Sequence, residues 1–319
     1  MSTYTHPNYG SLTGLTHLTT YESGMIKACK FEEAVTLHTD FGDLVPSYGE
    51  DNLRKRNGYD LEFHENGEIK AINLEDSVII DTALGSFPAE RLSFYPSGKL
   101  HRLFPLNGQI NGYWSEEDEA ALTTPYTLDL AVGTITAKII AFAFYESGPL
   151  KSLTIWPGQM IELTSPDGPV KCRFGFSLYE DGSLNSFEPG LPEPLTTPAG
   201  IILAYDPNAH GINCDSNSVV YAKDGTIQAL KTVHSGIQAL LSDEQVLIKA
   251  LMIPSMINPE VTVPNPLIIR FDVEEITIRQ NDTTYKLFAK DILKTVIVDD
   301  SQISTCGDCS SCSSCSHCG

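Results

Sequence analysis

Residues Phe94–Trp114 read FYPSGKLHRLFPLNGQINGYW, and this stretch decides the fold. An aromatic pair, Phe94 and Tyr95, precedes a polar turn that ends at Gly98. Glycine adopts the positive φ that closes a hairpin without steric cost. After the glycine, apolar and charged residues alternate in KLHRL, which is typical of a half-buried strand. The stretch therefore predicts a β-hairpin.

The same hairpin unit recurs along the chain. Six copies share an apolar or aromatic residue, a polar turn and a glycine: Tyr21–Ala28, Leu61–Ile72, Leu92–Leu103, Phe144–Leu153, Leu178–Phe187 and Val219–Leu230. Further turns are expected between the copies, at Asn107–Gly108, Thr82–Gly85 and Thr197–Gly200. Because one hairpin is too small to bury its apolar face, the copies must stack. We predict an all-β fold, an array of β-hairpin repeats that forms an elongated sheet or a single-stranded solenoid.

Phe94–Trp114 resembles the hairpin repeat of MORN-type proteins, in the divergent bacterial variety. There an aromatic pair, an Asn/Ser-Gly turn and a second Asn-Gly turn recur. FYESGPLKSLTIWPGQMI, Phe144–Ile161, resembles this repeat next best. The resemblance covers about two repeats well and residues 20–230 loosely. It implies a scaffold or partner-binding role, and it brings no catalytic residues.

Three regions follow from the change of pattern along the chain. Residues 1–230 form the repeat region, residues 231–298 a small terminal β-unit, and residues 299–319 a flexible cysteine-rich tail. The expected helices are short, around Glu116–Leu122 and Ser235–Leu241.

The charge of the chain bears on its partners. Lys and Arg number 21 against 41 Asp and Glu, so the formal net charge is −20. Such a chain repels phosphate backbones and anionic lipids, which argues against nucleic-acid and membrane binding. It suits a protein partner, and a basic one in particular. The N-terminus lacks a secretory pattern and no apolar run approaches the ~18–20 residues of a membrane span, so we expect a cytoplasmic protein.

The C-terminus holds the most distinctive chemistry. Residues 306–319 read CGDCSSCSSCSHCG, which places cysteines at a constant spacing of three. Thiolates are soft ligands, and two cysteines in C-x2-C reach one metal ion from a tight turn. The candidate metal ligands are Cys306, Cys309, Cys312, Cys315, Cys318 and His317.

Several roles for this tail stay open. The ligand set suits Zn²⁺, Cu(I) or an iron–sulfur cluster. A thiol redox tail, a tail that is modified or bound by a partner, and an incidental low-complexity end are the alternatives. In the loop DPNAHGINCDSN, His210 and Cys214 are a second candidate pair, although a surface loop explains them more simply.

No catalytic motif is present in the rest of the chain. His38 and Asp40 are interpreted as alternating positions on one strand, and Cys29 and Cys172 as core residues. The main hypothesis is a non-enzymatic β-repeat scaffold or binding protein that displays a metal-binding or redox-active polythiolate tail. The alternative is an acidic protein-interaction scaffold whose tail is a tether or a substrate for modification. An enzyme is the third hypothesis.

Overall fold

A computed structural model describes residues 2–50, 54, 58–209, 217–242, 244–255 and 258–298. Within these ranges the regular elements are strands, apart from one short α-helix and one 3-10 turn. The N-terminal strands are β1 (Ser2–His6), β2 (Gly10–Thr20), β3 (Ile26–Phe31), β4 (Leu37–Thr39), β5 (Gly42–Leu44), β6 (Leu61–Phe63), β7 (Ile69–Thr82), β8 (Gly85–Phe94) and β9 (Leu100–Phe104). Helix α1 (Glu116–Ala121) follows.

The later strands are β10 (Tyr126–Leu130), β11 (Gly133–Ala137), β12 (Ile139–Phe144), β13 (Leu150–Ile155), β14 (Ile161–Ser165), β15 (Gly168–Leu178), β16 (Leu184–Pro189), β17 (Glu193–Thr197), β18 (Gly200–Ala204), β19 (Val219–Tyr221), β20 (Ile227–Thr232), β21 (Ser235–Leu241), β22 (Glu244–Ile248), β23 (Leu251–Pro254), β24 (Thr262–Asn265), β25 (Leu267–Phe271), β26 (Ile276–Gln280), β27 (Thr283–Leu287) and β28 (Ile292–Ile297), with a 3-10 turn at Ala289–Asp291 before β28. Seventeen strands belong to one antiparallel sheet of hairpins, which confirms the predicted all-β hairpin fold.

The described residues divide into two compact units. Unit 1 holds 2–165 and 172–187, and unit 2 holds 166–171, 188–209 and 217–298. The limits predicted from the sequence, 1–230, 231–298 and 299–319, stay predictions; residue 230 lies within β20.

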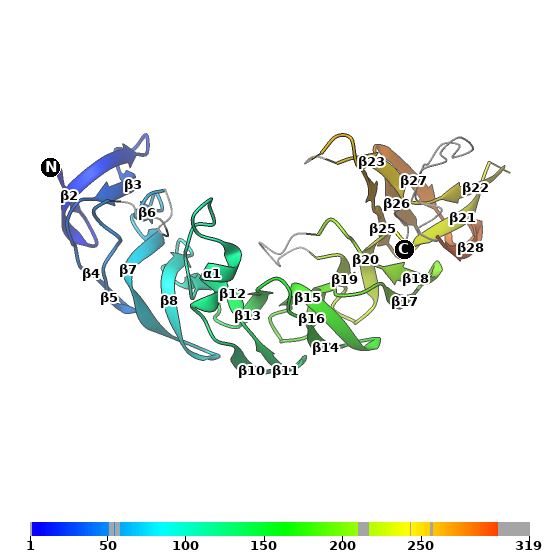
Figure 1. Ribbon diagram of the computed structural model, residues 1–319, viewed down its shortest axis with the longest axis horizontal. Coiled ribbons are helices and arrows are strands. Elements are labelled where there is room, and N and C mark those ends of the chain that lie inside the picture. Colours follow the sequence, from blue (N-terminus) through cyan, green and yellow to red (C-terminus); the bar gives the residue numbers. More distant parts are fainter. Residues whose placement is uncertain are drawn as a thin grey trace. The chain divides into compact units, whose positions relative to one another are not determined.

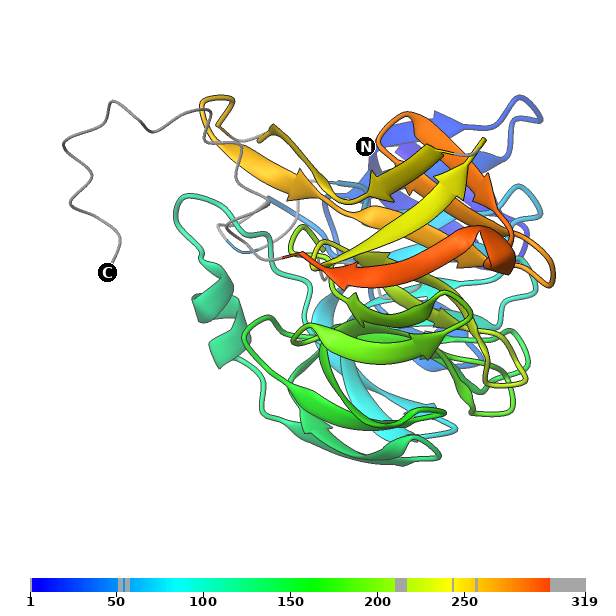
Figure 2. The same ribbon diagram turned by 90° about the vertical axis from the view of Figure 1, so that its right-hand side faces the viewer.

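In unit 1, successive hairpins lie side by side (Figure 1). The antiparallel order runs β1–β2–β3–β6–β7–β8–β9–β12–β13–β15. In unit 2, β19, β20, β25, β26 and β27 pair in that order. There β21 also lies between β22 and β28, as the yellow and red arrows of Figure 2 show.

The six repeat turns share one geometry. At the third copy, the backbone N–H of Gly98 donates to Tyr95 O over 2.9 Å, and that of Tyr95 donates to Lys99 O over 2.8 Å. The other copies make the equivalent two bonds. The turn glycine has a positive φ in every copy, +80° at Gly98 and +112° at Gly148. Each turn is thus a tight turn closed by a glycine at positive φ, as the sequence predicts.

The first residue of the turn also links one hairpin to the next. Its side chain donates a hydrogen bond to the carbonyl that precedes the following turn. These bonds are Tyr21 Oη to Phe63 O, His64 Nε2 to Phe94 O, Tyr95 Oη to Phe144 O and Tyr145 Oη to Leu178 O, over 2.8–3.0 Å. The recurring aromatic residue therefore connects each hairpin of unit 1 to the next by a hydrogen bond. Buried side chains, Phe and Leu among them, form the core.

Two local predictions are wrong. Ser235–Leu241 is strand β21 and not a helix, because Ile237 and Ala239 are buried while Gln238 and Leu240 are not, a period of two. Asn107–Gly108 does not close a hairpin, because the backbone N–H of Gly108 donates instead to a carboxylate of α1. The helix expected around Glu116–Leu122 is confirmed as α1.

Candidate functional site

The metal ligands predicted from the sequence lie outside the described residues. This holds for Cys306, Cys309, Cys312, Cys315, Cys318 and His317, and equally for His210 and Cys214. Their roles stay predictions. Among the residues that the structure describes, no group of three or more His, Cys, Asp or Glu is arranged to hold a metal ion.

The two described cysteines are core residues, as predicted. Cys29 and Cys172 are both fully buried. Burial, helped by the charge of Asp60, raises the pKa of the Cys29 thiol to about 12. The Cys172 thiol donates to Gly175 O over 3.0 Å. The Cys29 sulfur is therefore not placed to act as a thiolate at neutral pH.

The sequence was interpreted as placing His38 and Asp40 on one strand, and this interpretation is wrong. Strand β4 ends at Thr39, so Asp40 lies in the turn. His38 instead contacts Asp43 across the hairpin, with Nδ1 and Oδ1 2.6 Å apart. Both side chains are more than two-thirds exposed, so this pair is a surface contact rather than a preorganised base.

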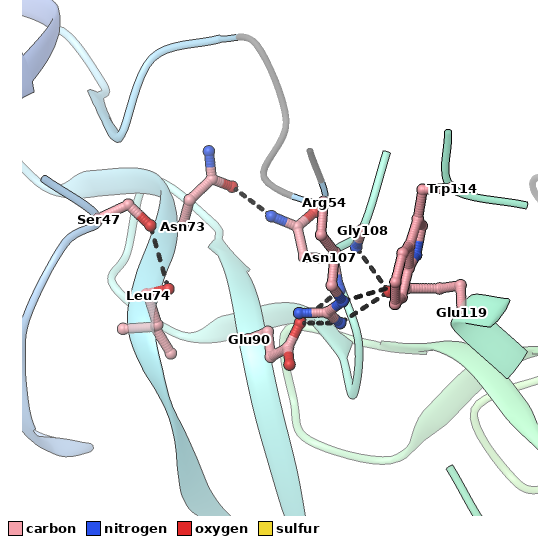
Figure 3. A network of polar contacts seen from close by, with 9 residues as sticks. All are labelled: Ser47, Arg54, Asn73, Leu74, Glu90, Asn107, Gly108, Trp114 and Glu119. Carbon is pink, nitrogen blue, oxygen red and sulfur yellow. Dashed lines mark hydrogen bonds and ion pairs between the residues drawn. The ribbon is translucent and has the colours of Figure 1, made fainter. Parts of the chain in front are cut away.

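A network of polar contacts in unit 1 is centred on Arg54 (Figure 3). The Arg54 guanidinium donates from Nε and Nη2 to the two carboxylate oxygens of Glu119, over 2.8 Å each. Nη2 also donates to Glu90 over 2.7 Å. Burial lowers the pKa of Arg54, but the bonds and charges of Glu119 and Glu90 outweigh it, so the pKa is raised above its ordinary value. The guanidinium thus joins α1 to β8 as a permanent cation.

Glu119 is almost fully buried and collects two further donors. The indole Nε1 of Trp114 donates over 2.6 Å and the backbone N–H of Gly108 over 2.7 Å. Only glycine fits at position 108, because a Cβ there would collide with the Glu119 carboxylate. Since buried carboxylates are costly unless paired, four donors on one carboxylate mark a built anchor.

The sequence places Glu119 through the start of α1. Ser115 and Asp118 form a capping box, in which each side chain accepts from the other's backbone N–H. The hydrogen bonds from the backbone and side chain of Ser115 lower the pKa of Asp118. One residue further on, Glu119 points inward to Arg54, while Glu116 and Glu117 are exposed.

A second layer of contacts extends the anchor to β7. The backbone N–H of Asn107 donates to Glu90 over 2.9 Å, and its side-chain amide donates to Asn73 over 3.1 Å. Beside these groups lies a cavity of about 60 Å³ with polar walls. This volume has room for about two water molecules.

The network fastens one long connection, residues 105–125, which joins β9 to β10 and contains α1 (Figures 1 and 2). We call it the 105–125 segment. It carries three exposed apolar side chains, with Ile110 52%, Tyr113 82% and Leu122 53% accessible. Next to it is a groove of about 480 Å³, whose walls include Pro88, Pro105, Leu106, Leu122 and Tyr126.

The chain was compared with known families, curated proteins and solved structures. No model of a known protein family, no curated protein and no solved structure matches the chain. The resemblance of Phe94–Trp114 to the MORN repeat stays a hypothesis. No helix in the described part of the chain has the length and apolarity to cross a bilayer.

Proposed function

We propose that the protein is a non-enzymatic scaffold that binds a partner protein through the 105–125 segment. The observation that carries the proposal is the anchoring of an exposed segment by buried ionic bonds. Connections longer than roughly 12–15 residues are uncommon in compact domains and usually have a function. Arg54, Glu90 and Glu119 fix this one in place, so its surface is preorganised for binding.

The exposed side chains of the segment suit a protein interface. Tyr113 is the most exposed aromatic residue of the described chain, and Ile110 and Leu122 accompany it. Ile79, opposite Pro88 in the β7–β8 pairing, adds a further side chain that is 66% accessible. Aromatic and aliphatic anchors of this kind supply most of the energy of protein interfaces.

The charge of the segment selects the partner. Residues 105–125 contain no Lys, Arg or His, and Glu116, Glu117 and Asp118 are exposed. Within the segment, Arg54 forms its ion pair with the buried Glu119. A partner segment that combines apolar anchors with Lys or Arg complements this surface. The net charge of −20 also attracts such a basic partner toward the protein and speeds association.

The test is affinity capture with the tagged full-length protein from a lysate of its own cells, quantified by mass spectrometry. A basic protein is expected that is lost with the double variant Tyr113→Ser/Leu122→Ser and retained with Val273→Ser. Val273 is fully exposed and belongs to unit 2, which makes it the matched control. Capture of the same proteins by the wild type and the double variant contradicts the proposal.

A second function is proposed for the tail, on the cysteine spacing alone. Cys306, Cys309, Cys312, Cys315, Cys318 and His317 offer more soft donors than one tetrahedral ion needs. The candidates are Zn²⁺, Cu(I) and an iron–sulfur cluster. Elemental analysis and an absorption spectrum of anaerobically purified protein, full-length and ending at Asp300, test it. Stoichiometric metal that disappears with the tail supports the proposal, and two metal-free proteins refute it.

A further inference from the structure

A larger cavity, of about 570 Å³, lies in unit 2. Its base is the face of strands β20, β25 and β26, and its rim includes the hairpin β23–β24 and the turn between β26 and β27. The volume falls in the range of about 300–1,000 Å³ that small-molecule sites occupy. Because strands form its base, its side chains are held more firmly than they would be on loops.

The strand register places two cations on this base. Lys231 pairs with Ile268, and Ile268 pairs with Arg279. Directly paired residues of an antiparallel sheet project from the same face, so the side chains of Lys231, Ile268 and Arg279 form one row. The row has an apolar centre and a positive group at each end.

The two cations differ in their partners. Lys231 Nζ contacts the buried carboxylate of Asp206 over 2.9 Å, so its charge is balanced within the protein. The guanidinium of Arg279 makes no hydrogen bond or ion pair with another described residue. It lines the cavity with its donors unused. A guanidinium offers two parallel N–H groups, which match a carboxylate or a phosphate.

Fixed amides complete the site. The side-chain amide of Asn265 donates to Asn281 Oδ1 over 2.6 Å, which holds the Asn281 side chain in place. Asn281 has a φ of +48°, as a two-residue hairpin turn requires. Asn281 lines the cavity together with Arg279, which lies two positions earlier in the chain. The wall of the cavity therefore combines an amide side chain with the cation.

We infer that this cavity binds a small polar molecule through an oxyanion, a carboxylate or a phosphate, which Arg279 receives and the Asn281 amide orients. Ile268 and Pro266 contact the apolar part of the molecule. Asp282 at the rim selects for ligands with one anionic group, because a second anionic group would be repelled by its carboxylate. The site is independent of the 105–125 segment, which belongs to unit 1.

Titration calorimetry on the full-length protein tests the inference, with butyrate, a monocarboxylate with an apolar chain, and inorganic phosphate as separate probes at about 150 mM salt. One of the two probes is expected to bind, and which one binds distinguishes a carboxylate from a phosphate site. Arg279→Gln is expected to weaken that binding at least tenfold. Arg270→Gln is the matched control, since Arg270 is also exposed on β25 but lies outside the cavity, and it is expected to change binding less than twofold.

Two results overturn the inference. One is the absence of binding for both probes up to about 10 mM, which corresponds to less than about 3 kcal/mol of binding free energy. The other is equal weakening by Arg279→Gln and Arg270→Gln, which would mean that the anion responds to the charge of the sheet and not to the cavity. Because Arg279 is exposed, Arg279→Gln is expected to fold, and the thermal melt of each variant verifies this.

Discussion

Replacing Arg54 by Met is expected to free the 105–125 segment while leaving the hairpin array intact. The change removes two of the four donors to Glu119, and with them the only cation that contacts it among the described residues. Breaking a buried ion pair by removing one partner costs about 3–5 kcal/mol. The Arg54 side chain is 27% accessible, so solvent recovers part of this, and we expect about 2–3 kcal/mol.

Chymotrypsin cleavage after Tyr113 or Trp114 under native conditions measures this opening. When opening and closing are fast, the cleavage rate follows the population of the open segment. A loss of about 2–3 kcal/mol raises that population roughly 30- to 150-fold. Fluorescence of Trp114, one of two tryptophans in the chain, reports the loss of the indole bond in parallel.

The matched control is Lys70→Met, which removes the exposed ion pair between Lys70 and Glu62 in the same unit. An exposed pair contributes about 0–1 kcal/mol, so cleavage should rise less than fivefold. If Arg54→Met accelerates cleavage no more than Lys70→Met does, Arg54 does not anchor the segment and the reasoning is refuted.

Three further predictions concern the array itself. Gly148 has a φ of +112°, so Gly148→Ala is expected to lower the unfolding free energy by about 1–3 kcal/mol in urea denaturation. The control Gly112→Ala, at a position with free space and no positive φ, should change the unfolding free energy by less than about 0.5 kcal/mol. Similar losses for the two variants would refute the turn geometry. Tyr95→Phe removes one bond to the next hairpin and should cost about 1 kcal/mol, against no measurable loss for the exposed Tyr113→Phe. Burial lowers the pKa of His6 from 6.5 to about 4 in the folded protein. As the pH falls from 6.5 to 4, the unfolded chain therefore binds a proton at His6 that the folded protein does not bind, and the free energy of unfolding decreases by at most about 3 kcal/mol. A His6→Gln variant with an unchanged slope in this pH range would show that another group is responsible.

The hairpin array could be predicted because its signals are local. A glycine at a fixed offset and alternating apolar residues determine each turn and each strand within about ten residues, as at Gly98. The hydrogen bond from Tyr95 to the next hairpin could not be predicted from the sequence, because it depends on which carbonyl lies next to Tyr95 in the neighbouring hairpin. The composition of Ser235–Leu241 favours a helix, because Gln, Ala and Leu are helix formers, but burial of Ile237 and Ala239 in unit 2 overrides that preference.

The anchor of the 105–125 segment could be predicted only in part. The capping box of Ser115 and Asp118 marks the start of α1 in the sequence. The partner of Glu119 is 65 residues away, in a stretch where nothing local distinguishes Arg54 from other basic residues. One signal was available, the absence of basic residues from 105–125, because a buried acid there must find its cation elsewhere in the chain.

The most direct test of partner binding at the 105–125 segment is site-specific photo-cross-linking in the full-length protein. A photoreactive phenylalanine analogue replaces Tyr113 in one protein and Val273 in the other, both at highly exposed positions. The proposed interface predicts one adduct at position 113, with a cross-linked peptide rich in Lys or Arg, and none of it at position 273. No adduct at position 113, or the same adduct at both positions, would contradict it.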